Sequence, residues 1–232
     1  MTRKYILLFI LSSFLFLEGK SQDKEFKPEW NIGIGGGPTF SSVSFEPFFR
    51  TKSKQQYHGG VAIRYISEKN LGLIAELNYS QQGWEQDFSR DNNTKNLGLQ
   101  HSHQLNYLEL PVLTHIYFGR KVRFFVNMGP KLSFLLSESE TMNKELEDFL
   151  ASGNAPADLK SYQYYRNANK KIDYGLMGGV GLEFRTGIGY FTLEGRYTFG
   201  LGDIYNNSKA DYFTRSANRN MSAKLTYYVK LF

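Results

Sequence analysis

The sequence predicts an all-β protein, an eight-stranded antiparallel up-and-down transmembrane β-barrel. Eight segments alternate apolar and polar side chains, and a period of two indicates strands whose two sides face different surroundings. The connections between these segments are alternately short and long, as in barrels with short periplasmic turns and long outer loops. An apolar run at the N-terminus, with no second run of comparable length, indicates export rather than a helical membrane protein.

Composition supports strands and excludes two other classes. Aromatic residues make up 16% of the 232 residues, with 22 Gly and only 6 Pro, a mixture that favours strands over helix bundles. The mean hydropathy of −0.43 argues against a polytopic helical membrane protein, but it is compatible with strands that are apolar on one side only. The net charge of +6 is too mild and too interspersed to indicate nucleic-acid binding. With 0 Cys, no disulfide can close the fold.

The N-terminal segment has the three parts of a signal peptide. Arg3 and Lys4 form a basic start, an apolar core follows from Tyr5 to Leu17, and Gly19 and Ser21 are small residues spaced for signal peptidase. We expect a signal peptide over 1–21, a short linker over 22–29 and the barrel over 30–232, in the outer membrane of a Gram-negative cell. Removing three basic residues and one acidic residue with the signal peptide lowers the net charge from +6 to +4.

The remainder of the chain divides into eight predicted strands. Their ranges are Trp30–Phe40, Tyr57–Ile66, Leu71–Gln81 (with a continuation to Gln86), Tyr107–Gly119, Val122–Leu136, Ile172–Phe184, Tyr190–Leu201 and Met221–Phe232.

Three short turns and four long polar connections join these strands. The turns lie near Ser67–Asn70, Gly119–Lys121 and Thr186–Gly189; the long connections are Ser41–Gln56, Asp87–Gln104, Ser137–Lys171 and Gly202–Asn220. Within the longest connection, the apolar residues of Thr141–Leu150 have helical spacing, which predicts a short amphipathic helix. A sandwich has no reason to place all its long loops at one end, so the pattern favours a membrane barrel.

Alternation alone does not assign the two faces, because a soluble lipocalin-like barrel would place its apolar face inside. The export signal, the loop asymmetry and the aromatic residues near strand ends favour the membrane arrangement, with aromatics at the interfaces and a polar lumen. Eight strands leave an interior only wide enough for side chains, so we expect a salt-bridged lumen rather than a general porin. The residues assigned to this lumen charge network are Arg64, Glu76, Glu109, His115, Arg123, Lys131, Asp173, Glu183, Glu194, Arg196, Lys224 and Lys230.

Histidines provide the candidates for chemistry. His101 and His103 lie on one side of an extended segment and could bind a metal, but without Cys or an evident third ligand we interpret them as ordinary loop residues. His115 and Glu109 share the lumen face of one strand and could act as an acid/base pair, although a histidine satisfied within the charge network is the favoured interpretation.

Two further segments have specific expectations. Tyr162–Tyr165 (YQYY), followed by Arg166, is either an outer-loop binding patch or part of the outer aromatic rim. Pro111 cannot donate to a β-ladder, and a closed barrel has no free edge, so we predict a β-bulge or local break beside Glu109.

The run YLELP resembles a motif of the PorT-like outer-membrane β-barrel family. It comprises Tyr107, Leu108, Glu109, Leu110 and Pro111, and it lies between Gly-rich first and sixth strands. The resemblance covers 30–232 and implies an eight-stranded outer-membrane barrel. It also implies an association with secretion and attachment of exported proteins, the role connected with the named member of the family.

The expected function is that of a non-enzymatic barrel which acts as a scaffold, a loop-mediated binding protein or a secretion accessory. The alternatives are a small barrel enzyme that modifies envelope lipid and a narrow channel. The sequence predicts no catalytic residue, cofactor or metal site. The expected partners are outer-membrane lipid and envelope or secretion-system proteins contacted through the outer loops, with no nucleic acid and a monomeric barrel.

Overall fold

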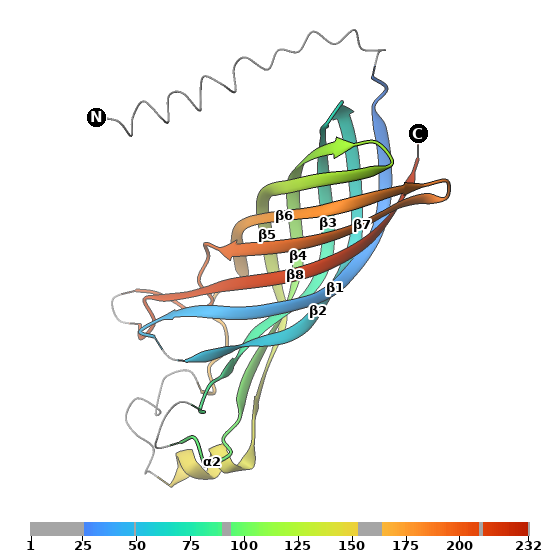
Figure 1. Ribbon diagram of the computed structural model, residues 1–232. Coiled ribbons are helices and arrows are strands. Elements are labelled where there is room, and N and C mark those ends of the chain that lie inside the picture. The colour runs from blue at the N-terminus through green and yellow to red at the C-terminus, as the bar shows by residue number, and fades with distance from the viewer. Residues whose placement is uncertain (1–25, 49, 90–93, 153–163, 209–210, 232) are drawn as a thin grey trace, which may run out of the picture.

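The computed structural model describes residues 26–48, 50–89, 94–152, 164–208 and 211–231. Eight strands form a closed barrel in chain order, and each strand pairs antiparallel with its sequence neighbours (Figure 1). The elements are β1 (Glu29–Glu46), β2 (Thr51–Glu68), β3 (Leu71–Gln86), β4 (His101–Gly119), β5 (Val122–Met142), α2 (Lys144–Ala151), β6 (Ile172–Thr186), β7 (Gly189–Gly200) and β8 (Arg215–Lys230). The predicted fold class is therefore confirmed. The predicted signal peptide, 1–21, lies outside the described residues.

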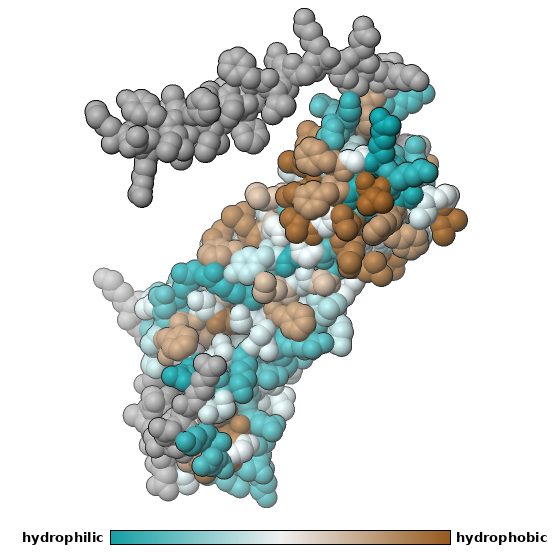
Figure 2. Space-filling view, viewed as in Figure 1, coloured by the Kyte–Doolittle hydropathy of each residue, from teal (hydrophilic) through white to brown (hydrophobic). Residues whose placement is uncertain are grey.

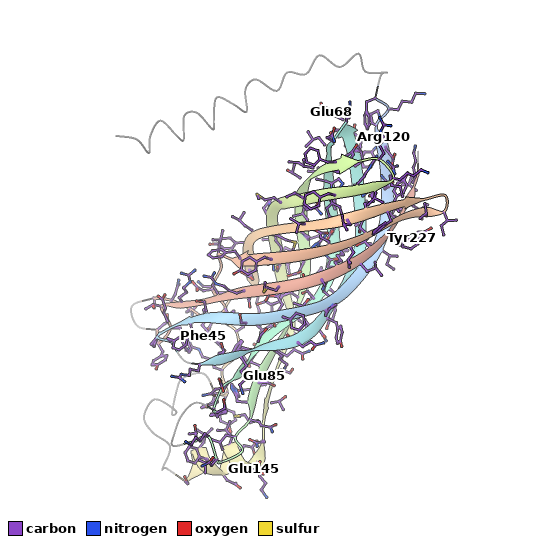
Figure 3. The ribbon with its side chains drawn as sticks, in the orientation of Figure 1. Phe45, Glu68, Glu85, Arg120, Glu145 and Tyr227 are labelled. Carbon is purple, nitrogen blue, oxygen red and sulfur yellow. The ribbon has the colours of Figure 1, made fainter. Side chains whose placement is uncertain are left out.

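One end of the barrel carries the short turns and the other carries the long connections (Figure 1). Asn70 between β2 and β3, and Gly119 before β5, have positive φ values of 72° and 112°, which tight reversals of the chain require. Figure 3 labels Glu68 and Arg120 at the turn end and Glu145 of α2 at the opposite end. Because short turns are periplasmic in outer-membrane barrels, α2 lies on the extracellular side.

The outer face of the barrel wall is apolar and the inner face is polar. Ile34 and Met128 point outward with 66% and 64% exposure, whereas Arg64 is 1% exposed inside. Brown, hydrophobic residues gather over the half of the barrel near the short turns, and the surface around α2 is mostly hydrophilic (Figure 2). This arrangement suits a barrel surrounded by hydrocarbon, and closure leaves no unpaired strand edge in the lipid. Within the described residues, no helix is long and apolar enough to cross a membrane.

Several strands continue beyond the predicted limits, and the largest additions lie toward the extracellular side. β1 runs past Phe40 to Glu46, β4 begins at His101 instead of Tyr107, and β5 continues past Leu136 to Met142. At 21 residues, β5 is much longer than the roughly 9–11 residues that cross a bilayer. In Figure 1, β3, β4 and β5 project out of the barrel and end near α2. We call the part of the structure beyond the apolar band the extracellular extension.

The predicted irregularity at Pro111 takes a milder form than a bulge. The β3–β4 register is the same on both sides of it, with Ala75 opposite Val112 and Asn78 opposite Glu109, but the ladder is interrupted between these pairs. The prediction of a β-bulge or local break at Pro111 is therefore confirmed as a local break without a bulge. The missing N–H of proline interrupts one ladder without inserting a residue. The irregularity between β4 and β5 lies instead at Asn106/Tyr107.

Candidate functional site

The end of the lumen near the periplasmic turns is filled by an arginine–glutamate cluster. Arg64 of β2 donates a hydrogen bond to Glu183 of β6, and both side chains are 1% exposed. Arg123 of β5 lies 3.4 Å from the same carboxylate. The guanidinium of Arg64 also stacks over the ring of Tyr228, 4.2 Å from its centroid. Charge pairing and ring contact together compensate for removing these groups from water.

In the middle of the lumen, one carboxylate serves two cations. Glu76 of β3 accepts hydrogen bonds from Arg196 of β7 at 2.7 Å and from Lys224 of β8 at 2.8 Å. Arg196 also donates to Glu194 at 2.7 Å, and Asn127 donates to the other oxygen of Glu194 at 2.8 Å. These contacts cross the barrel and tie opposite walls together.

A third layer lies toward the extracellular side. Glu109 of β4 accepts from Lys131 of β5 and from Gln82 of β3, each at 2.6 Å. Asp173 of β6 accepts from Asn218 of β8 at 3.0 Å. Glu109 of the YLELP run thus lies in the polar interior, while Leu110 points outward. The motif joins the lumen network to the lipid-facing surface.

Two predicted lumen residues are placed differently from the rest. His115 is buried and donates a hydrogen bond from Nδ1 to the amide oxygen of Asn127 at 2.7 Å, and Glu109 accepts from Lys131, so the structure does not assemble the His115–Glu109 acid/base pair. Lys230 lies at the periplasmic end of β8 with its side chain 52% exposed, 3.9 Å from Glu29. Lys230 is the last residue of β8, and at this position the strand has left the enclosed interior, so Lys230 lies on the rim of the barrel.

The described part of the lumen contains a small void between these side chains. A void of about 20 Å³ lies among residues that include His58, Glu109 and Arg196. This volume is enough for about one water molecule.

Above the polar layers, the interior changes to an apolar aromatic cluster that the sequence analysis missed. Its buried members are Val43, Phe45, Trp84, Leu105, Tyr107, Ala168, Ile204, Tyr205 and Phe213. Trp84 is 0% exposed and lies edge-on to Phe45 at 5.1 Å. The sequence contains a signal for this cluster. Val43 and Phe45 alternate with Ser42 and Ser44, and this alternation continues the first strand beyond its predicted end.

Two histidine–glutamate pairs follow beyond the aromatic cluster. His101 Nε2 lies 2.7 Å from Glu140, and His103 Nε2 lies 3.4 Å from Glu138. Both histidines are buried on β4, so their prediction as ordinary loop residues is wrong. The strand continues through them because alternate residues face the interior. Among the described residues, no group of three or more potential ligands is arranged to hold a metal ion.

The same glutamates hold the following loop against β5. Glu140 accepts from the backbone N–H of Tyr165 at 2.9 Å, and Glu138 accepts from that of Ala168 at 2.7 Å. Tyr164 donates to Gln86 at 2.6 Å, which anchors the second half of the YQYY segment. Tyr162 and Gln163 of that segment lie outside the described residues. The extension is therefore a folded unit rather than a set of independent loops.

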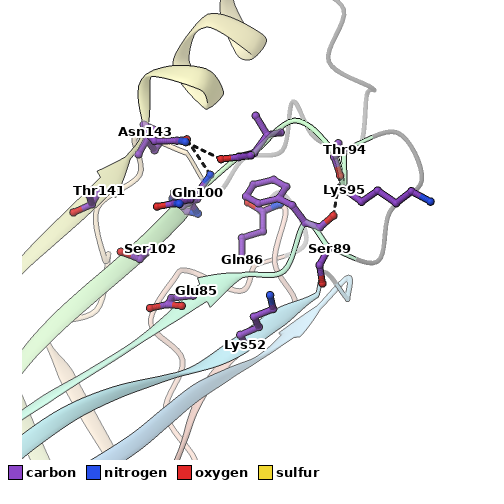
Figure 4. Close-up of a pocket in the computed structure, with 15 residues that line it drawn as sticks. Lys52, Glu85, Gln86, Ser89, Thr94, Lys95, Gln100, Ser102, Thr141 and Asn143 are labelled. Carbon is purple, nitrogen blue, oxygen red and sulfur yellow. Dashed lines mark hydrogen bonds between the residues drawn. The ribbon is translucent and has the colours of Figure 1, made fainter.

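A pocket of about 520 Å³ opens in the extracellular extension, between the ends of β3, β4 and β5 (Figure 4). Its lining combines amide, hydroxyl and charged groups with a few apolar side chains: Lys52, Glu85, Gln86, Phe88, Ser89, Thr94, Lys95, Gly98, Leu99, Gln100, His101, Ser102, Thr141, Met142 and Asn143. The size falls within the roughly 300–1,000 Å³ of small-molecule sites.

The wall of this pocket is fixed by the start of α2. Asn143 is the N-cap, and its side-chain oxygen accepts from the N–H of Leu146 at 3.3 Å and from the N–H of Gln100 at 2.9 Å. Its amide nitrogen donates to the carbonyl of Gly98 at 2.8 Å. One side chain thus joins the helix to the β3–β4 connection. The helix predicted over Thr141–Leu150 is present, but it begins later because β5 continues to Met142.

Comparison with known proteins agrees with this architecture. The model of the outer membrane protein beta-barrel domain family matches residues 20–206. The chain belongs to this family. It is an outer-membrane protein, and the match supports the general barrel family without selecting the PorT-like group. No curated protein matches the chain.

Solved barrels resemble the chain only weakly. The attachment invasion locus protein Ail of Yersinia pestis has 12% identity and a TM-score of 0.42, covering 87% of this chain and 99% of Ail. Neisserial surface protein A has 10% identity and a TM-score of 0.42, with the same coverage of 87% and 99%. The N-terminal barrel of Pseudomonas aeruginosa OprF has 8% identity and a TM-score of 0.34, covering 88% of this chain and 100% of that barrel. At such scores, these likenesses add nothing to the family assignment.

Proposed function

We propose that this protein is a non-enzymatic, non-conducting outer-membrane barrel that binds a ligand through its extracellular extension. The observation that carries the proposal is the pocket of about 520 Å³ held between β3, β4, β5 and the N-cap of α2. It lies beyond the apolar band, on the side of the membrane where an external ligand arrives.

The filled interior argues against the channel alternative. The void found among the three layers of paired charges holds about one water molecule, and the aromatic cluster lies between these layers and the outside. A conducting path would require both the ion pairs and the cluster to separate.

The position of His115 argues against the lipid-modifying alternative. A catalytic group for a membrane lipid must reach the outer rim, whereas His115 is 1% exposed inside the barrel and is bonded to Asn127. Of the described residues, none forms a nucleophile–base pair at the lipid-facing rim.

The lining of the pocket favours a hydroxyl-rich ligand such as an oligosaccharide. Gln100, Ser102 and Thr141 supply amide and hydroxyl groups that both donate and accept, and Lys52 and Glu85 add charges of opposite sign. The ring of Phe88 borders the pocket but is 7% exposed and belongs to a buried cluster with Leu99 and Leu146, so it forms part of the apolar wall.

An oligosaccharide array probed with protein in lipid nanodiscs tests this proposal. We expect binding by the wild type and its loss in Thr141→Trp, which fills the pocket. Ser139→Trp is the matched control, because Ser139 is exposed two positions earlier on β5 and does not line the pocket. Absence of binding to every oligosaccharide, or unchanged binding by Thr141→Trp, would contradict the proposal. Stable unit conductance in planar bilayers would contradict its non-conducting part.

The secretion-accessory role implied by the PorT-like resemblance is a separate prediction about partners. Co-purification of one stable envelope protein from intact outer membrane would support it. Retention of that protein by Thr141→Trp would place the contact outside the pocket.

A further inference from the structure

The lipid-facing wall of the barrel has a shallow apolar groove of about 920 Å³ across β5, β6, β7, β8 and β1. Its floor is formed by residues with little or no side chain. Gly195 lies opposite Val180 on one side and Ala223 on the other, and Gly178 lies opposite Tyr197. A Cβ placed on Gly178 or Gly195 would meet no heavy atom within 4 Å, so both positions are open to the lipid.

The extracellular end of this groove is marked by a cation. Phe199 lines the groove, and the guanidinium of Arg219 lies over its ring at 4.2 Å from the centroid. In the β-ladders, Arg219 is paired with Phe199 on one side and with Ser42 on the other. On β8, Arg219 is the next outward-facing residue after Met221, which lines the groove. Arg219 thus lies where the apolar band ends and headgroups begin.

Arg219 of β8 is a charged outward residue at this level, and β1 at the edge of the groove and β2, β3 and β4 beyond it lack one. The first outward residues beyond the apolar band on β1, β2, β3 and β4 are uncharged, and they are Ser42, Gln55, Gln81 and Asn106. Among the described residues, no carboxylate forms an ion pair with Arg219. The contact of its guanidinium is with the ring of Phe199. A partly exposed guanidinium without a carboxylate partner is suited to a phosphate oxygen pair.

We propose that the groove and Arg219 form a binding site for a phosphorylated, acylated lipid of the outer leaflet. An acyl chain would lie over Gly195 and Gly178, and the phosphate would accept hydrogen bonds from Arg219. The groove supplies the apolar contact and the arginine supplies selection for an anionic headgroup. The site is independent of the extracellular pocket, since it lies on the outer wall of the barrel.

Native mass spectrometry of the full barrel tests the site, with phosphatidylglycerol and phosphatidylcholine of identical acyl chains as probes. We expect the wild type to retain phosphatidylglycerol preferentially. Arg219→Gln should lower that preference about fivefold, the factor expected for one basic residue near an anionic lipid surface. The matched control is Lys121→Gln, which removes an exposed cation from the turn at the opposite end.

A second variant tests the groove separately from the headgroup. Gly195→Leu fills the floor without a steric conflict, so it should fold and lose retention of both lipids. Equal retention by Arg219→Gln and Lys121→Gln would overturn the headgroup assignment, and unchanged retention by Gly195→Leu would overturn the acyl-chain assignment. A wild-type dimer that Gly195→Leu dissociates would show that a second copy of the chain occupies the groove, which also overturns the proposal.

Discussion

The membrane-spanning barrel and the extracellular extension are built from the same strands, but their interiors have opposite chemistry. On β4, the membrane part directs Ile116 and Leu110 outward and Glu109 inward. Beyond the membrane, the same strand directs Gln104 outward and Leu105 inward. The period of two continues along the strand, but the inward side chains change from polar to apolar and the outward ones from apolar to polar.

The surrounding solvent explains this reversal. Hydrocarbon surrounds the membrane part, so polar side chains are placed in the lumen, where they pair with one another. Water surrounds the extension, so burying apolar side chains is favourable there, as in any soluble β-protein. The register irregularity between β4 and β5 lies at Asn106/Tyr107, where the two chemistries meet. A bulge at this point re-aims the strands as they leave the membrane.

Removing a shared carboxylate from the lumen should have the largest effect. In Glu76→Gln, Arg196 and Lys224 both lose the negative charge that compensates for their burial. We expect a loss of about 4 kcal/mol in the free energy of unfolding, because breaking a buried ion pair leaves an uncompensated charge. Urea unfolding of the barrel in lipid vesicles measures it. The control Glu68→Gln removes an exposed carboxylate at the end of β2 and should be near neutral; equal effects of the two substitutions would refute a structural role for the network.

Truncating the aromatic cluster should separate the two regions. Trp84→Ala removes the largest fully buried side chain of the extension, at a cost of about 3 kcal/mol. We expect the extension to open to protease while the membrane part stays resistant. Trp30→Ala provides a matched comparison, since Trp30 is the other of the 2 Trp residues and faces outward near the periplasmic end. Simultaneous loss of both regions in Trp84→Ala would mean that they unfold as one unit.

Loss of the helix cap should be smaller and confined to the pocket wall. Asn143→Ala removes the acceptor for the N–H groups of Leu146 and Gln100, and the expected cost is about 1 kcal/mol. Faster hydrogen exchange of the amides of α2 would report it. The control Asn106→Ala removes a side-chain contact with Ser137 remote from α2. Unchanged exchange in α2 would show that packing of Leu146, rather than the cap, holds the helix.

Acidification should have the smallest effect and act on the extension. Burial lowers the pKa of His103 below its ordinary value of 6.5, although the hydrogen bond to Glu138 raises it in part. The folded extension therefore favours neutral His103, while the unfolded extension takes up a proton as pH falls below about 6.5. The free energy for opening the extension should fall over this interval. Hydrogen exchange at the amide of Ala168 measures it, and a pH dependence that persists unchanged in His103→Gln would exclude His103 as its source.

Much of the barrel follows from the sequence because the relevant signals are local. The alternation in β6 and β7 and the three short turns identified strands, faces and the loop-bearing end. The predicted strands end before the extension because the outward apolar residues stop at Phe40 and Leu136. Beyond these residues the period of two continues with reversed polarity, so a test for periodicity alone would have found β1 as far as Phe45. The loop prediction for His101 and His103 fails for the same reason.

The sequence by itself determined the closed eight-stranded architecture, because a period of two and alternate turn lengths depend only on neighbouring residues. Only the tertiary structure decided which charges meet inside it. Glu76 and Arg196 are 120 positions apart, and their contact depends on how closure of the barrel staggers β3 against β7. The pocket beside α2 and the groove beneath Arg219 likewise arise where several strands meet. Such sites require the positions of distant residues in space, which no local pattern encodes.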